Sequence, residues 1–309
     1  AIKQIRFELA QVHLNEKQDP LMATETARRI LDIEPHTANE LMELEALFMR
    51  AEAYGEAVKV LGRRAELLDE PGEQADVWLQ VGEIYERYIG RSAGAAQAYE
   101  RALEVRPDHP VAFEKLGALF EQNGDHRRLV ELLQRRIQTT QDPDDRLALQ
   151  LRVAELQERW LGSKDLAFSA ACAALQESPV SETARAAAER LADQTDNWDV
   201  LVDLYEDLVD ELPLREAYVL RLRTAEILLE HGTEPERAER PLEMALATRP
   251  GDPRASELMA RLLEQQGRHR DLGIHLRDQV ELTDDPEVRA ALWARIAELE
   301  EAALGQIEA

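Results

Sequence analysis

The residues that could carry chemistry in this sequence are one cysteine, seven histidines and a large excess of carboxylates. The single cysteine, Cys172, excludes a disulfide within the chain and a cysteine-based zinc site. No two histidines have the His-Glu-x-x-His spacing of a zinc hydrolase, and the sequence contains neither a glycine-rich phosphate loop nor a Gly-x-Ser-x-Gly motif. We therefore predict no catalytic residue, no metal site and no cofactor.

The charge balance narrows the choice of partners. The chain has 62 acidic and 37 basic residues, a net charge of −25, whereas binding to a phosphate backbone needs a cationic surface. This argues against nucleic acid. The longest apolar run, from Ala167 to Leu175, is far shorter than the roughly 18–20 residues that span a bilayer, so we expect no membrane insertion. No signal peptide opens the sequence, and cytoplasm is the default expectation. The 32 arginines against 5 lysines favour a bacterial source.

The elements that must position these residues follow from an internal repeat. Prolines recur at intervals of 72, 72 and 71 residues, at Pro35, Pro107, Pro179 and Pro250. Whole segments align at the same spacing: Leu-Arg-Val-Ala-Glu-Leu at 151–156 recurs as Leu-Arg-Thr-Ala-Glu-Ile at 222–227. Each period of about 72 residues divides into two related units of about 36 residues.

Each unit has the pattern of two amphipathic helices. Between Asp76 and Pro107, apolar residues recur with helical spacing on both sides of a turn at Gly90. Several joints place an N-cap residue before a proline, at Asp142-Pro143, Ser178-Pro179, Asp252-Pro253 and Asp285-Pro286. A single helix pair cannot bury its apolar stripe alone, so the pairs must stack into an all-α solenoid. The predicted repeats of this single solenoid are 1–36, 37–72, 73–108, 109–144, 145–180, 181–215, 216–251, 252–287 and a partial repeat at 288–309.

One unit carries large, small and proline residues at fixed spacing: Trp78, Val81, Gly82, Tyr85, Ala95, Tyr99, Ala102 and Pro107. This set resembles the tetratricopeptide repeat, W-x2-L-G-x2-Y followed by A-x3-F-x2-A-x4-P. The resemblance covers the whole chain and implies a right-handed α-solenoid. It is degenerate at 183–193, where Arg185 and Glu189 occupy the large and glycine positions, and the turn at 87–94 is one residue longer than usual.

Two further repeat positions predict packing roles. Small residues recur where two helices should approach closely, at Gly82, Gly117, Ala154, Ala225 and Ala297. Aromatic or imidazole rings recur just after an inter-helix turn, at Tyr54, His126, Trp198 and His269, and predict packing rather than metal ligation. Cys172 lies in an alanine-rich second helix, which predicts a buried and unreactive thiol.

The resemblance also implies a binding surface, because first helices of the family line a concave groove for partner segments. The residues that it places there are Leu79, Glu83, Glu86, Leu151, Glu155, Glu158, Leu222, Glu226 and Glu298. Glutamates two units apart would stand about 20 Å from one another, beyond the ~8 Å Debye length, and would act as separate contacts. The Lys, Asn and Arg residues with which the family's chaperone-tail binders hold a carboxylate are missing here.

We therefore predict a noncatalytic scaffold that binds a protein or peptide segment with Arg or Lys beside an apolar anchor. Against this stands the hypothesis that the glutamates only solvate the surface, since arginines lie three residues away in pairs such as Arg223 and Glu226. The alternatives are a recognition arm of a larger enzyme whose catalytic domain lies outside this segment, and a rod that associates head to tail through apolar ends. Because neither end has a polar capping helix, we expect a segment of a longer protein.

Overall fold

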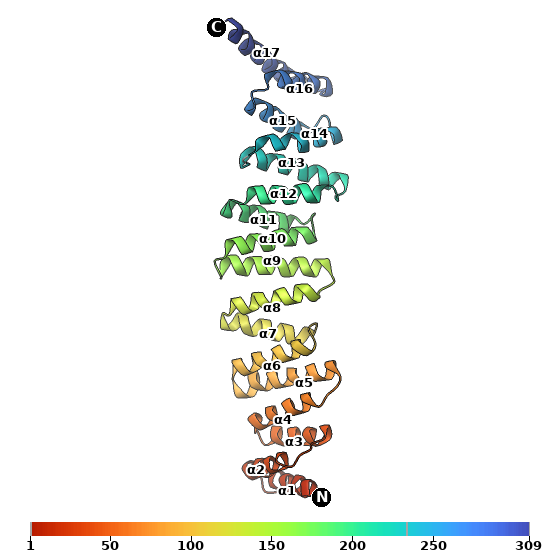
Figure 1. Ribbon diagram of the computed structural model, residues 1–309, viewed down its shortest axis with the longest axis vertical. Helices are drawn as coiled ribbons and strands as arrows, with labels where there is room; N and C mark the ends of the chain where they lie inside the picture. The colour runs from red at the N-terminus through yellow and green to blue at the C-terminus, as the bar shows by residue number, and fades with distance from the viewer. Residues whose placement is uncertain (1, 233, 309) are drawn as a thin grey trace. The chain divides into compact units, whose positions relative to one another are not determined.

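All regular secondary structure that the computed structural model describes is helical, as Figure 1 shows. The structure describes residues 2–232 and 234–308, with side chains described up to residue 301. The helices are joined by short turns, and each packs against the next along the chain within two compact units, Ala1–Gln141 and Asp142–Ala309. The predicted all-α stack of helix–turn–helix pairs is confirmed.

Unit 1 consists of four helix pairs. They are α1 (Ile2–Asn15) with α2 (Pro20–Leu31), α3 (Ala38–Arg50) with α4 (Tyr54–Glu66), α5 (Pro71–Ile84) with α6 (Ser92–Val105), and α7 (Pro110–Asn123) with α8 (His126–Thr139). A π-helical turn, η1 (Tyr85–Ile89), continues α5. We call the odd-numbered helices first helices and the even-numbered helices second helices.

Unit 2 continues the same alternation. Its helices are α9 (Pro143–Arg159), α10 (Lys164–Glu177), α11 (Glu182–Thr195), α12 (Trp198–Val209), α13 (Leu214–Glu230), α14 (Glu239–Thr248), α15 (Pro253–Gln265), α16 (His269–Leu282) and α17 (Pro286–Glu308), with a 3-10 turn, η2 (Pro235–Ala238), before α14. Each of the first eight predicted repeat ranges corresponds to one first and one second helix, although α5, α9, α13 and α17 each begin two residues before the predicted boundary; the ranges themselves stay a prediction.

The helix starts follow the predicted capping chemistry with one exception. Asp142 accepts hydrogen bonds from the amides of Asp144 and Asp145 at 2.8 and 3.2 Å, and Asp252 caps α15 in the same way. The prediction for Ser178 is wrong: Ser178 ends α10, its amide donating to the Ala174 carbonyl at 3.2 Å. The cap of α11 is Ser181, whose hydroxyl accepts from an amide of the first turn.

The extra residue predicted in the turn near Gly90 is accommodated by the π-helical turn η1. A π-helical turn contains more residues than an α-helical one, so an insertion widens the helix locally without changing the pairing of its neighbours. Gly90 then reverses the chain with a φ of 69°, a conformation that favours glycine. The insertion therefore stays local to the end of α5.

At the small-residue position, the structure requires glycine at Gly82. A Cβ atom there would lie 2.2 Å from Cε1 of the buried Tyr99, so no larger residue fits without movement. Gly117, at the same repeat position, has no such neighbour, since its nearest contact would be 3.8 Å. Ala225 is fully buried, as predicted, whereas Ala297 is exposed, because no further helix among the described residues covers that side of α17. The prediction at Ala297 is wrong.

The aromatic position after the turn has a packing role, as predicted. Tyr54, at the start of α4, stacks on Tyr88 in η1. Trp198, at the start of α12, stacks on His231 directly after α13. Each stack joins the start of a second helix to the end of the following first helix and so contributes to the contact between successive pairs.

Candidate partner-binding face

The predicted groove residues all lie on first helices or their direct continuation. Leu79 and Glu83 lie on α5, Glu86 on η1, Leu151, Glu155 and Glu158 on α9, Leu222 and Glu226 on α13, and Glu298 on α17. We call the side of the first helices that carries these residues the first-helix face. Leu79 and Leu151 are half-buried, whereas Leu222 is only 5% exposed and belongs to the core. Little of the Leu222 side chain is thus available to a partner.

On α9 of unit 2, both glutamates are paired with arginines. Glu155 accepts hydrogen bonds from Arg152 and Arg159 of its own helix, each at 2.7 Å. Glu158 is held by the guanidinium of Arg190 on α11, with one contact of 2.8 Å, and by the Gln194 amide at 3.4 Å. The hydrogen bond from Arg190 lowers the pKa of Glu158, so this carboxylate is ionised and neutralised within the array.

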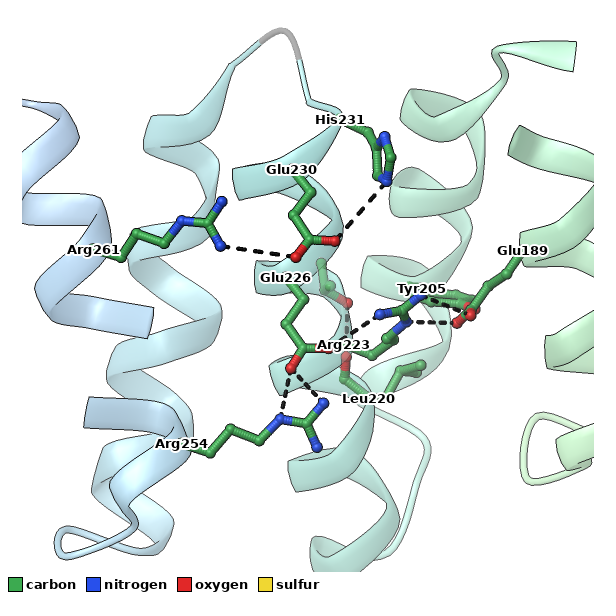
Figure 2. A network of polar contacts seen from close by, with 10 residues as sticks. Glu189, Tyr205, Leu220, Arg223, Glu226, Glu230, His231, Arg254 and Arg261 are labelled. Carbon is green, nitrogen blue, oxygen red and sulfur yellow. Dashed lines mark hydrogen bonds and ion pairs between the residues drawn. The ribbon is translucent and has the colours of Figure 1, made fainter. Parts of the chain in front are cut away.

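The network around α13 is denser, as Figure 2 shows. Arg223 donates two hydrogen bonds to Glu189 of α11, from Nε at 3.0 Å and Nη2 at 2.9 Å, and a third to Glu226 at 3.1 Å. Glu226 also accepts from Nε of Arg254 on α15 at 2.6 Å. The Tyr205 hydroxyl donates to Glu189 at 2.9 Å, so each of the two carboxylates accepts hydrogen bonds from two residues.

Glu189 is the residue that makes its repeat degenerate, and the network explains why a carboxylate is tolerated at a glycine position. The Glu189 side chain is 18% exposed and is turned toward Tyr205 and Arg223. A charge this deeply placed needs paired donors to offset its desolvation. Tyr205 and Arg223 supply them, and burial together with Glu189 raises the pKa of the Tyr205 hydroxyl.

Ion pairs continue along the same face to the last helix. Arg261 of α15 lies 3.8 Å from Glu230 of α13. Arg295 of α17 reaches Glu257 at 2.8 Å and Glu264 at 2.6 Å on α15. Most charges on the first-helix face of unit 2 are therefore paired, several of them between successive first helices, whereas the exposed Glu298 has no hydrogen bond or ion pair among the described residues.

The first-helix face of unit 1 differs. Glu83 is half-buried, and within the described part of the chain no hydrogen bond or ion pair reaches its carboxylate. Glu86 accepts the Tyr99 hydroxyl at 2.7 Å and lies 3.8 Å from Nζ of Lys115. Met42, on α3, is 53% exposed. Unit 1 thus offers an uncompensated carboxylate together with exposed apolar surface.

Sequence reasoning missed the arginines that pair across this face. Arg190, Arg254 and Arg261 belong to the intervening units, on α11 and α15, and not to the units that carry the glutamates. These arginines are not seen when only the units that carry the glutamates are compared with one another. The signal was present for two of them, because Arg190 and Arg261 occupy in their units the repeat position that Glu155 and Glu226 occupy in the preceding ones, whereas the intervening units of unit 1 carry Ala46 and Ala118 there.

Residues 112–147, which include most of α7 and all of α8, match the family model of the tetratricopeptide repeat. These residues form a tetratricopeptide repeat within an array of stacked helix pairs. The array is similar to the C-terminal part of a repeat protein from Cytophaga hutchinsonii, with 14% identity, a TM-score of 0.32 and coverage of 82% of this chain and 98% of that one. It is also similar to a tetratricopeptide repeat protein from Parabacteroides merdae, with 16% identity, a TM-score of 0.32 and coverage of 84% of this chain and 98% of that one.

The yeast protein Tom70 is similar at 13% identity and a TM-score of 0.35, over 93% of this array and 60% of the Tom70 chain. No curated protein sequence matches this chain.

The other groups that could react, Cys172 and the histidines, lie in structural positions. Cys172 is half-buried on α10, and burial raises the pKa of its thiol to about 11, which disfavours the reactive thiolate. His109 caps α7: Nδ1 accepts from the Ala112 amide at 3.2 Å, and Nε2 donates to Asp76 at 3.1 Å. Across the described residues, no three His, Cys, Asp or Glu side chains are arranged to hold a metal ion, and no helix has the length and apolarity needed to cross a membrane.

Proposed function

We propose that this tetratricopeptide-repeat array is a noncatalytic protein-interaction scaffold, and that it holds a partner segment on the first-helix face of unit 1. The observation that carries the proposal is Glu83, a half-buried carboxylate with no hydrogen bond or ion pair among the described residues, on the same helix as the half-buried Leu79. The resemblance to the family implies that this face receives partner segments.

The partner segment has a basic residue beside an apolar anchor. An arginine or lysine that pairs with Glu83 gains a charge-assisted hydrogen bond, and it displaces no existing ion pair of that carboxylate among the described residues. The apolar anchor covers Leu79 and Met42. The charge of −25 also favours the approach of a basic segment at low ionic strength.

Unit 2 has a different part in this proposal. A basic partner would have to displace Arg254 or Arg223 from Glu226, or Arg190 from Glu158, before it could pair with these carboxylates. The paired residues of α9 to α17 thus hold successive first helices in register, and the leucines Leu151 and Leu222 support that packing. Binding through Glu83 is therefore stronger than binding through Glu226.

The proposal is tested by affinity capture from a lysate of the source cells with the whole chain and two variants. Glu83→Arg should lose a partner that the wild type retains, while Glu66→Arg, an exposed glutamate on the second helix α4, should retain it. The captured complex should weaken as salt rises from about 0.05 to 0.5 M, because the contact is electrostatic. Equal capture by Glu83→Arg, or affinity that is independent of salt, would contradict the proposed site.

A further inference from the structure

Cavities of similar construction lie between successive second helices, each with a first helix at its floor. They lie between α4 and α6 over α5, between α6 and α8 over α7, and between α12 and α14 over α13, with volumes of about 610, 260 and 520 Å³. In each cavity the first helix contributes the same two repeat positions, three residues apart. These residues are Trp78 and Val81 in the first cavity, Phe113 and Leu116 in the second, and Arg221 and Thr224 in the third.

In the third cavity the cationic side chain lies on the first helix and the apolar side chain on the second helix, the reverse of the other two cavities. In the first two cavities an arginine of the second helix covers the aromatic floor: Arg101 lies 4.6 Å from the Trp78 ring centroid and Arg136 lies 5.4 Å from that of Phe113. In the third cavity the floor is Arg221 and the corresponding residue of α14 is Met244. Arg221 therefore has no aromatic ring in the place where the other arginines find one.

The Arg221 guanidinium lacks hydrogen-bond partners. Its side chain is only 11% exposed, its Nε is buried without a partner, and the nearest carboxylate oxygen, from Asp210, is 3.9 Å away. Considering the residues that the structure describes, Arg221 makes no hydrogen bond. The neighbouring Thr224 cannot help, because its hydroxyl donates to the Leu220 carbonyl at 2.9 Å. Buried donors of a charged group are costly when unpaired, and they are normally satisfied by an acceptor.

The rim of the cavity defines the rest of the ligand. Glu206 is paired with Arg237 at 2.8 Å, and Glu239 with Arg268 at 2.8 Å, so these carboxylates are already neutralised. Glu236 and Glu243 have no ion pair with any described residue and would attract a cation. Val209, Pro241 and Met244 supply apolar wall between the charged groups.

We propose that the α12–α13–α14 cavity binds a small zwitterionic ligand. Its carboxylate accepts hydrogen bonds from the Arg221 guanidinium, its cationic group lies near Glu236 and Glu243, and a short aliphatic chain between them contacts Met244. A volume of about 520 Å³ is within the range of small-molecule sites. This site lies on the second-helix side and does not depend on the proposed groove of unit 1.

The test uses three probes of equal chain length: 6-aminohexanoate, hexanoate and hexylammonium. Arg221 Nε–H is observed in ¹H–¹⁵N spectra of the whole chain while each probe is added. We expect a saturable shift with 6-aminohexanoate at a Kd on the order of 1–10 mM, a weaker one with hexanoate, and none with hexylammonium. No shift with either carboxylate, or an equal shift with hexylammonium, would overturn the proposal.

Variants then assign the two ends of the ligand, with the Met244 methyl signal as a second reporter. Arg221→Gln should abolish binding of 6-aminohexanoate. Arg136→Gln, which removes the arginine that covers Phe113 in the cavity between α6 and α8, should leave this binding unchanged. The double variant Glu236→Gln/Glu243→Gln should weaken 6-aminohexanoate about threefold, to the level of hexanoate. An Arg221→Gln protein with native helix content that still binds would refute the site, and the wild-type titration stands even if this variant fails to fold.

Discussion

The rings of Trp198 and His231 are stacked, with centroids 4.4 Å apart and an interplanar angle of 10°. Tyr54 and Tyr88 form the same contact in unit 1, at 4.5 Å and 15°. The two stacks lie two 72-residue periods apart, at the same repeat positions. The chain therefore reuses one aromatic contact to join consecutive helix pairs, and histidine replaces tyrosine without loss of the stacking geometry.

Removal of one ring should weaken the joint. His231→Ala is expected to lower the free energy of unfolding by about 0.5–1.5 kcal/mol, the usual contribution of an aromatic pair, whereas His231→Phe should preserve it. The measurement is urea unfolding followed by circular dichroism. An alanine variant as stable as the phenylalanine variant would show that the stack adds nothing to stability.

Gly82 should tolerate no side chain. Gly82→Ala places a Cβ atom 2.2 Å from the Tyr99 ring, and the hydrogen bond from the Tyr99 hydroxyl to Glu86 opposes rotation of that ring away. We expect a loss of about 1–3 kcal/mol by overpacking. Gly117→Ala is the matched control at the same repeat position: its nearest contact is 3.8 Å, so the better helix propensity of alanine should leave stability unchanged or slightly raised. Thermal unfolding of both variants distinguishes the sites, and equal melting temperatures would contradict this account.

Glu189 should contribute to the stability of unit 2. Glu189→Gln removes the charge that Arg223 and Tyr205 surround, and we expect a loss of about 1.5–3 kcal/mol, because hydrogen bonds to charged groups are stronger than neutral ones. Glu25→Gln, in an exposed ion pair with Arg29, should change stability by less than about 0.5 kcal/mol. Urea unfolding midpoints provide the comparison, and a Glu189 effect as small as the Glu25 effect would show that the network is only superficial.

Stability should fall with acidification through His275. Burial lowers the pKa of this imidazole below its ordinary value, although the Ser256 backbone carbonyl, 3.1 Å from Nε2, and the carboxylates of Asp278 and Glu257 favour the charged form. The unfolded chain then binds a proton more readily than the folded chain. The free energy of unfolding should therefore decrease as pH falls below about 6.5. The melting temperature of the wild type should therefore be lower at about pH 5.5 than at about pH 7.5, and this drop should be smaller in a His275→Gln variant. A drop of the same size in the variant would show that other groups cause it.

Cys172 should react slowly in the folded chain. With its pKa raised to about 11, only about one thiol in a thousand is ionised at pH 8, and the side chain is half-buried. We expect a thiol reagent such as 5,5′-dithiobis(2-nitrobenzoate) to label native Cys172 at least about tenfold more slowly than the urea-unfolded chain. Equal rates would indicate an accessible thiol and contradict the structural role.

Local features of the sequence were sufficient for much of the fold. The aspartate–proline caps and the helical spacing of apolar residues predicted the helix pairs, because each depends on residues within one or two turns of each other. The period of 72 residues extended this prediction along the chain. The same reasoning failed at Ser178 and Ala297. A cap depends on where the previous helix ends, and burial depends on which helix follows.

Only the tertiary structure showed which of the predicted binding residues are already paired with a cation. Glutamates at one repeat position look alike in the sequence, yet Glu83 lacks a cationic partner among the described residues, whereas Glu226 is held by Arg223 and Arg254. Arg254 is 28 residues from Glu226 along the chain, and stacking of α13 on α15 brings the two together. The repeat therefore determined which side chains line the first-helix face. Packing between successive units decided which of their charges remain open to a partner, because the strength of an ion pair depends on distance and burial and not on separation along the sequence.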